Sequence, residues 1–324
     1  MHYKRASNTD LAQASAVIEL IVPNALAGTR LDAALARMLP EHSRTRIKSW
    51  IESGRVTVDG VALAPRHRLD GGEALVVAGC AGPTQTTDAP EAIDLRIVHE
   101  DEAILVVDKP AGLVVHPGAG NRAGTLLNAL LHHAPLLASL PRAGIVHRLD
   151  KDTTGLMVVA KTPEAQTDLV RQLASRSVTR EYLALACGDI ATSVVVDAPI
   201  GRHPVQRTTM AVIENGKPAR TYVEVLERHG VVTLVRCRLE TGRTHQIRVH
   251  LASLGAPLVG DVVYGARRVS RLPEPLRKFP RQALHAERLA LRHPETQLQQ
   301  CFVAPLPADF RTLFEAIAML RETS

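Results

Sequence analysis

The sequence predicts an α+β protein in two parts. A small N-terminal α/β unit precedes a larger unit built on a mixed, mainly antiparallel β-sheet with flanking helices. The first observation behind this prediction is a helix, helix and hairpin pattern within about 50 residues, followed by the linker-like "GCAGPTQTTDAPEA". The second is that the β-rich runs "AILVVD", "GLMVVAK" and "TLVRCRL" lack the regular alternation with helices that a parallel sheet needs.

Four segments follow from this pattern. We expect a loose polar tail over residues 1–16, the small unit over 17–80, a linker over 81–92 and the large unit over 93–324. The tail lacks the apolar core of a signal peptide, and no stretch reaches the roughly 18 apolar residues of a membrane span. We therefore expect a soluble, cytoplasmic protein without a membrane contact.

The small unit is expected to begin with a helix that ends at Pro40. Thr29 resembles its N-cap, with Asp32 three residues further on. Ser43 then opens a second helix, and Gly54 ends it. The stretch "VTVDGVAL" predicts a strand, an Asp-Gly turn and a second strand. The apolar faces of the two helices comprise Leu31, Leu35, Leu39, Ile47, Trp50 and Ile51.

The charge of the chain favours a polyanionic partner such as nucleic acid. The net charge is +6 and the pI is about 9.4. Aromatic residues make up only 3% of the chain, which argues against a broad stacking platform for single-stranded RNA. Two basic regions are candidate RNA contacts, although each could equally be a solvated surface: residues 266–281, and the small unit's Arg44, Arg46, Lys48, Arg55, Arg66 and Arg68.

Three helices are expected in the large unit. The first covers residues 125–133, and the second begins with Thr162 as its cap and Pro163 in its first turn. The third lies in "THQIRVHLASLG" and ends at Gly255. Its buried face is predicted to consist of Ile247, Leu251 and Leu254.

The sequence contains no convincing cofactor or metal motif, and we expect neither. "PGAGNRAGT" has one residue too many between its last two glycines for a dinucleotide loop. The four cysteines form no C-x-x-C pair, and His245 and His250 are five residues apart rather than four. Neither H-E-x-x-H nor G-x-S-x-G occurs.

Carboxylates and arginines remain as candidate chemistry. In "HRLDKDTTG", Asp150 is expected at a strand-to-loop junction, where a side chain can be both held and exposed. Arg243 and Arg248 lie in "ETGRTHQIR". An arginine within about 4–6 Å keeps an aspartate ionised, and an ionised carboxylate can act as a nucleophile. On these residues alone, a structural Asp–Arg pair in a polar turn stays open.

The large unit resembles the RluA-type pseudouridine synthases. Five segments of this chain resemble the family's sequence blocks and occur in the same order: "VVDKPAGLVVHPG", "HRLDKDTTGLMVVAKT", "REYLAL", "GRTHQIRVHLASLGAPLVGDVVYG" and "RQALHAERLALRHP". The small unit resembles the S4 RNA-binding domain in its R-L-D, S-R-x-x-I and G-x-V-x-V-D-G elements, so the resemblance covers about residues 17–320. Within the family, the blocks are most similar to the group that modifies large-subunit ribosomal RNA.

The resemblance implies conversion of uridine to pseudouridine at a nucleotide flipped out of RNA, without a cofactor. It implies that Asp150 is the catalytic aspartate, that Arg248 pairs with it, and that Tyr182 packs on the target base and takes part in proton removal. Arg148 would hold the displaced nucleotide, and Leu149 would shape the pocket. The remaining residues implied at the RNA or substrate are Arg243, Arg44, Lys48 and Arg55.

The resulting hypothesis is a monomeric enzyme that acts on large-subunit ribosomal RNA or on the assembling large subunit. Asp108 and Asp152 are expected to be structural, because neither occupies the family position. The main alternative is a non-catalytic RNA-binding assembly factor, and Tyr182 could be an ordinary core aromatic.

Overall fold

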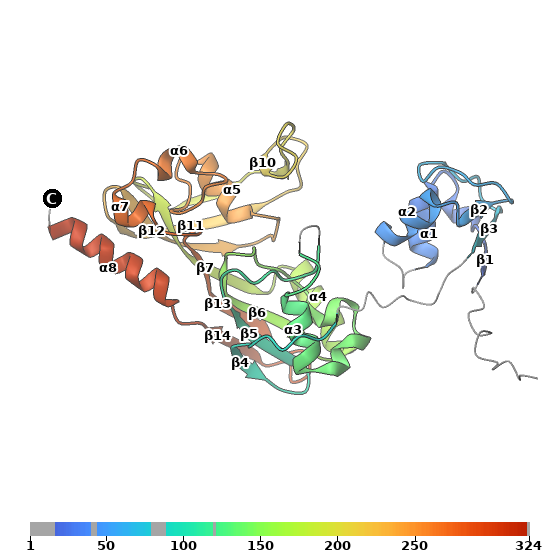
Figure 1. Ribbon diagram of the computed structural model, residues 1–324, viewed down its shortest axis with the longest axis horizontal. Helices are drawn as coiled ribbons and strands as arrows, with labels where there is room; N and C mark the ends of the chain where they lie inside the picture. Colours follow the sequence, from blue (N-terminus) through green and yellow to red (C-terminus); the bar gives the residue numbers. More distant parts are fainter. Residues whose placement is uncertain (1–16, 40–43, 79–88, 119–120, 323–324) are drawn as a thin grey trace, which may run out of the picture. The chain divides into compact units, whose positions relative to one another are not determined.

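The computed structural model describes residues 17–39, 44–78, 89–118 and 121–322 (Figure 1). Its internal contacts divide the chain into two compact units, Met1–Thr87 and Asp88–Ser324, which are described separately here. The expected tail, Ser43 and residues 81–88 of the expected linker lie outside the described residues.

The N-terminal unit packs two helices against a small antiparallel sheet whose strand order is β1-β3-β2. The predicted helical face is confirmed, because Leu31, Leu35, Ile47, Trp50 and Ile51 are all buried in one cluster. The elements are β1 (Ile18–Ile21), η1 (Asn24–Leu26), α1 (Leu31–Met38), α2 (Arg44–Glu52), β2 (Val56–Val58) and β3 (Ala74–Val77).

Two local predictions in this unit are wrong. The N-cap of α1 is Arg30, because Thr29 still belongs to the preceding turn and donates its backbone N–H to the Leu26 carbonyl. The second half of "VTVDGVAL" is not a strand, since Val58 and Val61 form only an isolated bridge. Strand β2 pairs instead with the distant β3, whose residues supply the apolar contacts that the exposed Val61 lacks.

The second unit contains a large mixed sheet with the order β4-β5-β6-β13-β7-β12-β11-β8, and β14 also pairs with β13. All of its pairings are antiparallel except β6 with β13, which confirms the predicted sheet class. Strands β9 (Ile200–Arg202) and β10 (Met210–Val212) form a separate hairpin. The strands of the large sheet are β4 (Ile97–Glu100), β5 (Ile104–Lys109), β6 (Thr154–Ala160), β7 (Thr179–Cys187), β8 (Val194–Asp197), β11 (Arg220–Arg228), β12 (Val232–Leu239), β13 (Leu284–Arg292) and β14 (Gln299–Val303).

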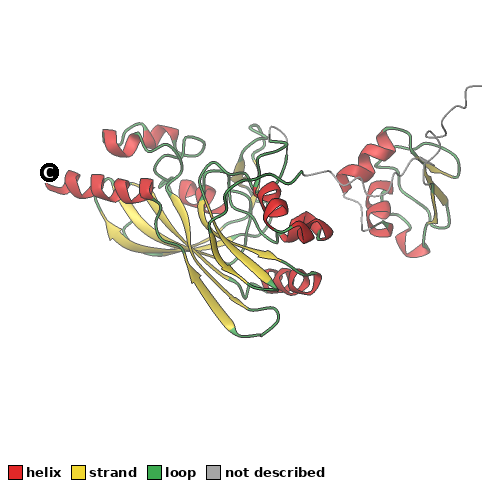
Figure 2. Cartoon of the chain, turned by 60° about the horizontal axis from the view of Figure 1, so that its bottom comes forward, coloured by secondary structure: helices red, strands yellow, loops and turns green. Residues whose placement is uncertain are grey.

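Helices flank this sheet (Figure 2). Thr162 caps α4 as predicted, and Thr125, predicted as the first residue of its helix, is the N-cap of α3; their side chains accept hydrogen bonds from the N–H groups of Ala165 and Asn128. The prediction for α5 is wrong at Leu254, which is 43% exposed because the helix ends before it. The helical elements are α3 (Leu126–His133), η2 (Pro135–Ser139), η3 (Pro141–Gly144), α4 (Pro163–Ala174), α5 (Gln246–Ser253), α6 (Ala266–Val269), α7 (Glu274–Arg277) and α8 (Ala308–Glu322).

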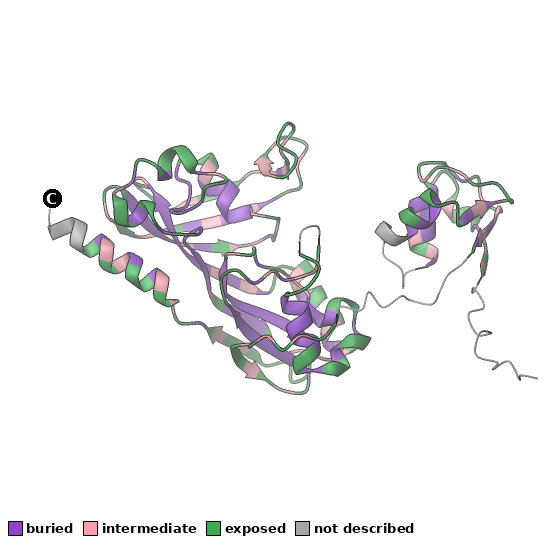
Figure 3. Cartoon of the chain, viewed as in Figure 1, coloured by how far each residue is buried: buried purple, intermediate pink, exposed green. Residues whose placement is uncertain are grey.

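The central strands are buried on both faces (Figure 3). In β5, Leu105 and Val107 face the cluster that contains α3 and α5, while Ile104 and Val106 face the cluster that contains α4. This double burial explains why the run "AILVVD" is continuously apolar instead of alternating.

Strands β6 and β13 touch only briefly. Their parallel register comprises Thr154 with His285 and Gly155 with Ala286, and β14 then lies beside the rest of β13. Gly155 has φ of 109°, and a Cβ at this position would collide with the Ala286 backbone. The crossing therefore requires glycine, and it fixes the point at which the preceding loop meets the sheet.

Residues 89–92 pack on the second unit. The backbone N–H of Glu91 donates to the Asn128 carbonyl, and the Asn128 side chain donates to the Ala89 carbonyl. The ordered part of this unit thus begins earlier than the expected residue 93.

Candidate active site

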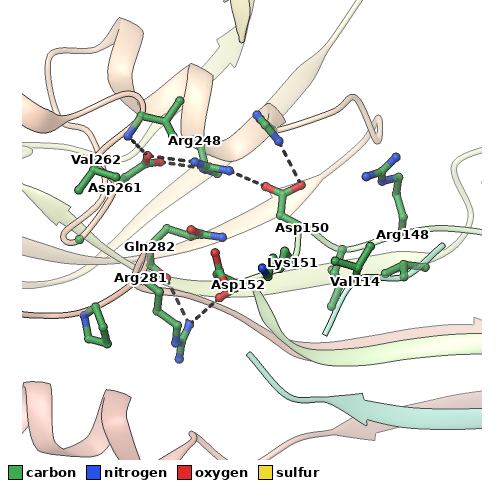
Figure 4. Close-up of a pocket in the computed structure, with 16 residues that line it drawn as sticks. Val114, Arg148, Asp150, Lys151, Asp152, Arg248, Asp261, Val262, Arg281 and Gln282 are labelled. Atoms are coloured by element: carbon green, nitrogen blue, oxygen red, sulfur yellow. Dashed lines mark hydrogen bonds and ion pairs between the residues drawn. The ribbon is translucent and has the colours of Figure 1, made fainter. Parts of the chain in front are cut away.

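Asp150 lines a pocket of about 330 Å³ at the end of the loop that leads into β6 (Figure 4). The side chain of Asp150 is 16% exposed, so it is held by protein and still reachable from solvent. Five separate segments line the pocket: residues 114–115, residues 148–152, residues 245 and 248, residues 260–263 and residues 280–282.

Arg248 connects two carboxylates (Figure 4). Its Nη1 donates to Asp150 Oδ2 at 3.1 Å, while its Nε and Nη2 donate to the two oxygens of Asp261 at 2.7 and 3.0 Å. Burial opposes the charge of Arg248, but the hydrogen bonds and charges of Asp261 and Asp150 raise its pKa overall. Asp150 therefore has a permanent cation beside it.

The start of α5 aims Arg248 into the pocket. Gln246 Oε1 accepts hydrogen bonds from the Thr241 hydroxyl at 2.8 Å and from the Arg243 backbone N–H at 2.9 Å, which closes the turn before the helix. His245, the N-cap, has φ of 56° in the left-handed region. Its ring faces Asp150, with Nε2 at 3.8 Å from Oδ1.

Two buried cations support the Asp150 loop through its backbone. Lys109 Nζ donates to the carbonyls of Lys151, Leu113 and Pro110 at 2.8–2.9 Å. Burial lowers the pKa of Lys109 to about 7, against the opposing charges of Asp152 and Asp150. Arg281 Nη1 donates to the Asp152 carbonyl at 3.1 Å, and Asp309 holds the same guanidinium.

His147 anchors the other end of this loop. Its Nε2 accepts a hydrogen bond from the Val158 backbone N–H at 3.1 Å, which requires a neutral ring. Burial, assisted by the charge of Arg180, lowers the pKa of His147 to about 3. The first residue of "HRLD" is thus a structural contact to β6.

Tyr182 and Leu149 belong to the core beneath the pocket. They are 6% and 4% exposed and pack in the same apolar cluster. Burial raises the pKa of Tyr182, and the charge of Asp150 acts in the same direction. Tyr182 is therefore protonated near Asp150, but it does not line the pocket in the free protein.

The two other arginines predicted for the site differ in position, because only one of them lines the pocket. Arg148 is exposed and lines the pocket on the other side of Asp150 from Arg248 (Figure 4). Arg243 does not line the pocket, and its Nε donates to the Pro218 carbonyl at 3.0 Å. The two acids expected to be structural also differ, since Asp108 pairs with Arg96 whereas Asp152 lines the pocket.

The structure shows which cations of the two basic regions are exposed. Lys48 is exposed and pairs with Glu52 at 3.4 Å, Arg55 is exposed, and the side chain of Arg44 lies outside the described residues. Residues 266–281 form a packed pair of short helices, because Val269, Leu272, Leu276 and Phe279 are buried. The exposed cations of this segment are Arg267, Arg268, Arg271, Arg277 and Lys278.

Reasoning from the residues alone missed His245, Asp261, Lys109 and Arg281 as parts of the site. The only available signal was that each lies in a sequence block shared with the family. Across the described ranges, no group of three or more His, Cys, Asp or Glu side chains is placed to hold a metal ion. His250 turns away from the pocket and bonds to Thr221 and to the Ala198 carbonyl.

Comparison with known proteins defines the class first. Residues 103–253 match the family model described as RNA pseudouridylate synthase, and residues 29–75 match the S4 domain. Two human proteins have related solved structures. RNA Pseudouridylate Synthase Domain Containing 4 has a TM-score of 0.54 and 27% identity, covering 69% of this chain and 93% of that one. Domain Containing 1 has a TM-score of 0.51 and 30% identity, covering 71% and 97%.

Curated relatives narrow the comparison. A Ribosomal large subunit pseudouridine synthase D from Nitrosomonas europaea is 57% identical over 95% of this chain and 90% of its own length. The protein of the same name from Pseudomonas aeruginosa is 55% identical over 93% and 96%. The chain therefore belongs to the RNA pseudouridine synthase family. Among the helices of the described residues, none has the length and apolar character needed to cross a bilayer.

Proposed function

We propose that this protein isomerises specific uridines to pseudouridine in large-subunit ribosomal RNA, at a nucleotide flipped out of a stem-loop. The observation that carries the proposal is the partly exposed Asp150 in a pocket, with Arg248 fixed behind it by Asp261. The names of the curated relatives, which cover most of this chain, support the choice of RNA.

The chemistry needs an ionised carboxylate and a way to move one proton. The bond between uracil N1 and the anomeric carbon breaks, a bond from C5 to that carbon forms, and the C5 proton leaves as N1 gains one. Asp150, which accepts a hydrogen bond from Arg248, can attack the sugar or the base, or can assist elimination to a glycal. Tyr182 is the candidate for packing on the base and for taking part in removal of the C5 proton, which requires that its hydroxyl first give up its own proton, since burial raises its pKa.

Neighbouring residues fit the handling of a flipped nucleotide. Extracting the base costs a few kcal/mol, and contacts between cations and phosphates offset that cost. Arg148 is exposed at the pocket, so it can follow the displaced nucleotide, and Leu149 forms part of the pocket wall. Arg243 lies outside the pocket lining, where its role would be to contact RNA rather than Asp150.

The main alternative is an RNA-binding assembly factor without catalysis. Pure binding has no use for a carboxylate facing an RNA backbone, still less for one fixed by a buried arginine. We also propose that the enzyme is a cytoplasmic monomer and acts on free ribosomal RNA or on the assembling subunit.

Asp150→Asn tests the catalytic proposal, with Asp152→Asn as the matched control in the same loop. Release of tritium from [5-³H]uridine-labelled ribosomal RNA should fall at least about 10³-fold in the first variant. RNA affinity should stay close to that of the wild type, and Asp152→Asn should remain active because the loop uses its carbonyl. Full activity of Asp150→Asn would contradict the assignment.

We further propose that residues 17–80 form an S4-like domain that supplies RNA affinity through Arg44, Lys48 and Arg55. Deleting residues 1–80 should weaken binding of ribosomal RNA while the second unit keeps its circular dichroism spectrum. Unchanged affinity and unchanged site selection, mapped on the same RNA, would exclude this role.

A further inference from the structure

A chain of contacts runs from Asp150 to the β9–β10 hairpin. Asp150 Oδ1 lies 3.8 Å from His245 Nε2, and His245 Nδ1 lies 2.7 Å from the Tyr264 hydroxyl. The same hydroxyl oxygen lies 2.9 Å from the backbone nitrogen of Met210 in β10. Neither the imidazole of His245 nor the hydroxyl of Tyr264 takes part in the hydrogen bond between Arg248 and Asp150.

The direction of hydrogen bonding along this chain follows from chemistry. The backbone N–H of Met210 can only donate, so the Tyr264 oxygen accepts from it. The hydroxyl proton of Tyr264 is then free to be donated to His245 Nδ1. A neutral imidazole that accepts at Nδ1 carries its proton on Nε2, which is the nitrogen facing Asp150.

The surroundings favour the neutral ring. Burial lowers the pKa of His245, and the positive charges of Arg248 and Arg148 act in the same direction. The charges of Asp150 and Asp261 oppose this effect without reversing it. A neutral donor facing a carboxylate can orient it without competing with Arg248 for the role of counter-ion.

The backbone indicates that the ring has a task other than helix capping. His245 adopts φ of 56°, a left-handed conformation that is strained for a non-glycine residue. It occupies the N-cap position of α5, yet its side chain makes no capping hydrogen bond. The imidazole is instead turned toward Asp150 and Tyr264.

The gap to Asp150 suits a contact that closes during the reaction. At 3.8 Å the His245–Asp150 distance exceeds a hydrogen bond, whereas Arg248 already holds the other oxygen at 3.1 Å. Hydrogen bonds of catalytic groups are often long in the free enzyme and shorten when substrate binds. A small rotation of the carboxylate would complete the second contact.

The β9–β10 hairpin holds the Tyr264 end of this chain of contacts. Its base packs on α5 through Ile200 and Val249, with Met210 and Tyr264 against the same cluster. Its tip is exposed, with Val205 82% accessible and Arg207 also at the surface, and it projects beside α5 (Figure 1). The packing of the β9–β10 hairpin on α5 therefore sets the position of the Tyr264 hydroxyl, which is bonded to β10.

We propose that His245 is a positioning residue for Asp150, and that Tyr264, held by the backbone of the β9–β10 hairpin, fixes the tautomer in which it donates to that carboxylate. The expected effect of His245 on the reaction rate rests on the proposed isomerisation. The expected tautomer of His245 does not rest on it.

Nitrogen NMR of the full-length protein, labelled with ¹⁵N-histidine, tests the tautomer without any substrate. His245→Asn identifies the signal and keeps a residue that tolerates left-handed backbone. We expect a neutral Nε2–H ring at pH 7.5, and loss of that preference in Tyr264→Phe. Tyr222→Phe, which removes a half-buried hydroxyl bonded to Glu240, should leave the signal unchanged. An Nδ1–H ring in the wild type would overturn the proposal.

Single-turnover kinetics test the consequence. His245→Asn should lower the rate of isomerisation about 10- to 100-fold at saturating enzyme, with RNA affinity unchanged. Tyr264→Phe keeps the ring over Arg248 and should lower the rate less, and the double variant should be no slower than His245→Asn because both act through one contact. An unaltered rate in His245→Asn would overturn the positioning role. Absence of activity in the wild type would instead refute the proposed function and leave the NMR result to decide the tautomer.

Discussion

Asp261→Asn tests whether the catalytic carboxylate depends on a second carboxylate behind its arginine. The side chain of Asp261 is fully buried and accepts from Arg248 at two atoms. Its Oδ1 also accepts from the backbone N–H groups of Val263 and Tyr264 at 3.1 Å. Asparagine preserves the shape, but it removes the charge and places an NH₂ donor against other donors.

The expected loss of stability is large. Removing one partner of a buried ion pair costs about 3–5 kcal/mol, because the remaining charge stays buried. For a domain of this size, that corresponds to a fall in Tm of roughly 6–20 °C. The control is Asp197→Asn, which removes an exposed carboxylate that accepts from two nitrogens of Arg220 at one oxygen and should cost at most about 1 kcal/mol.

Differential scanning calorimetry is the appropriate assay. The single tryptophan, Trp50, lies in the N-terminal unit, so its fluorescence would report on the wrong part of the chain. The transition of the second unit should move to lower temperature in Asp261→Asn, and the isomerisation rate should fall because Arg248 loses its anchor. If Asp261→Asn lost no more stability than Asp197→Asn, Arg248 would be held by something other than Asp261.

The remaining predictions concern the loop that carries Asp150. Gly155→Ala should destabilise the second unit by several kcal/mol more than Gly188→Ala, because both have positive φ but only Gly155 lies against another backbone; equal losses by calorimetry would refute the crossing argument. The His147 ring is neutral in the folded protein, whereas in the unfolded chain it takes up a proton below about pH 6.5. Its contribution to the free energy of unfolding is therefore present above pH 6.5 and declines as the pH falls toward 3. The stability difference between wild type and His147→Gln, measured by urea unfolding, should therefore narrow by about 2 kcal/mol from pH 7 to pH 5; a constant difference would mean that His147 is protonated in the folded state.

Local signals predicted the local structure well where nothing distant competed. Thr125 and Thr162 begin their helices as expected, because a cap needs only the next three residues. Thr29 failed because the N–H groups that it would cap, those of Leu31 and Asp32, already bond to carbonyls from a distant loop. The "VTVDGVAL" hairpin failed because β3 offered a better-buried partner. A local sequence pattern does not show that a distant segment competes for the same backbone or apolar contacts.

The site was predictable only in part. The position of Asp150 and its pairing with Arg248 came from the resemblance, and the geometry agrees with the pairing. The supporting contacts of Lys109 and Arg281 depend on segments far apart in the chain, which the sheet order brings to one loop. No spacing rule relates those residues, because their proximity is a product of the whole fold.

The support of the Asp150 loop has a consequence for how this site can change over evolution. Lys109 and Arg281 hold the carbonyls of Lys151 and Asp152, and every amino acid presents the same carbonyl. The path of the loop thus depends on the carbonyls at 151 and 152, and on a side chain only at 152, where the charge of Asp152 helps to keep Lys109 protonated. Position 151 can be exchanged to suit a different RNA while Asp150 keeps its place, so substrate preference can drift there without rebuilding the catalytic centre.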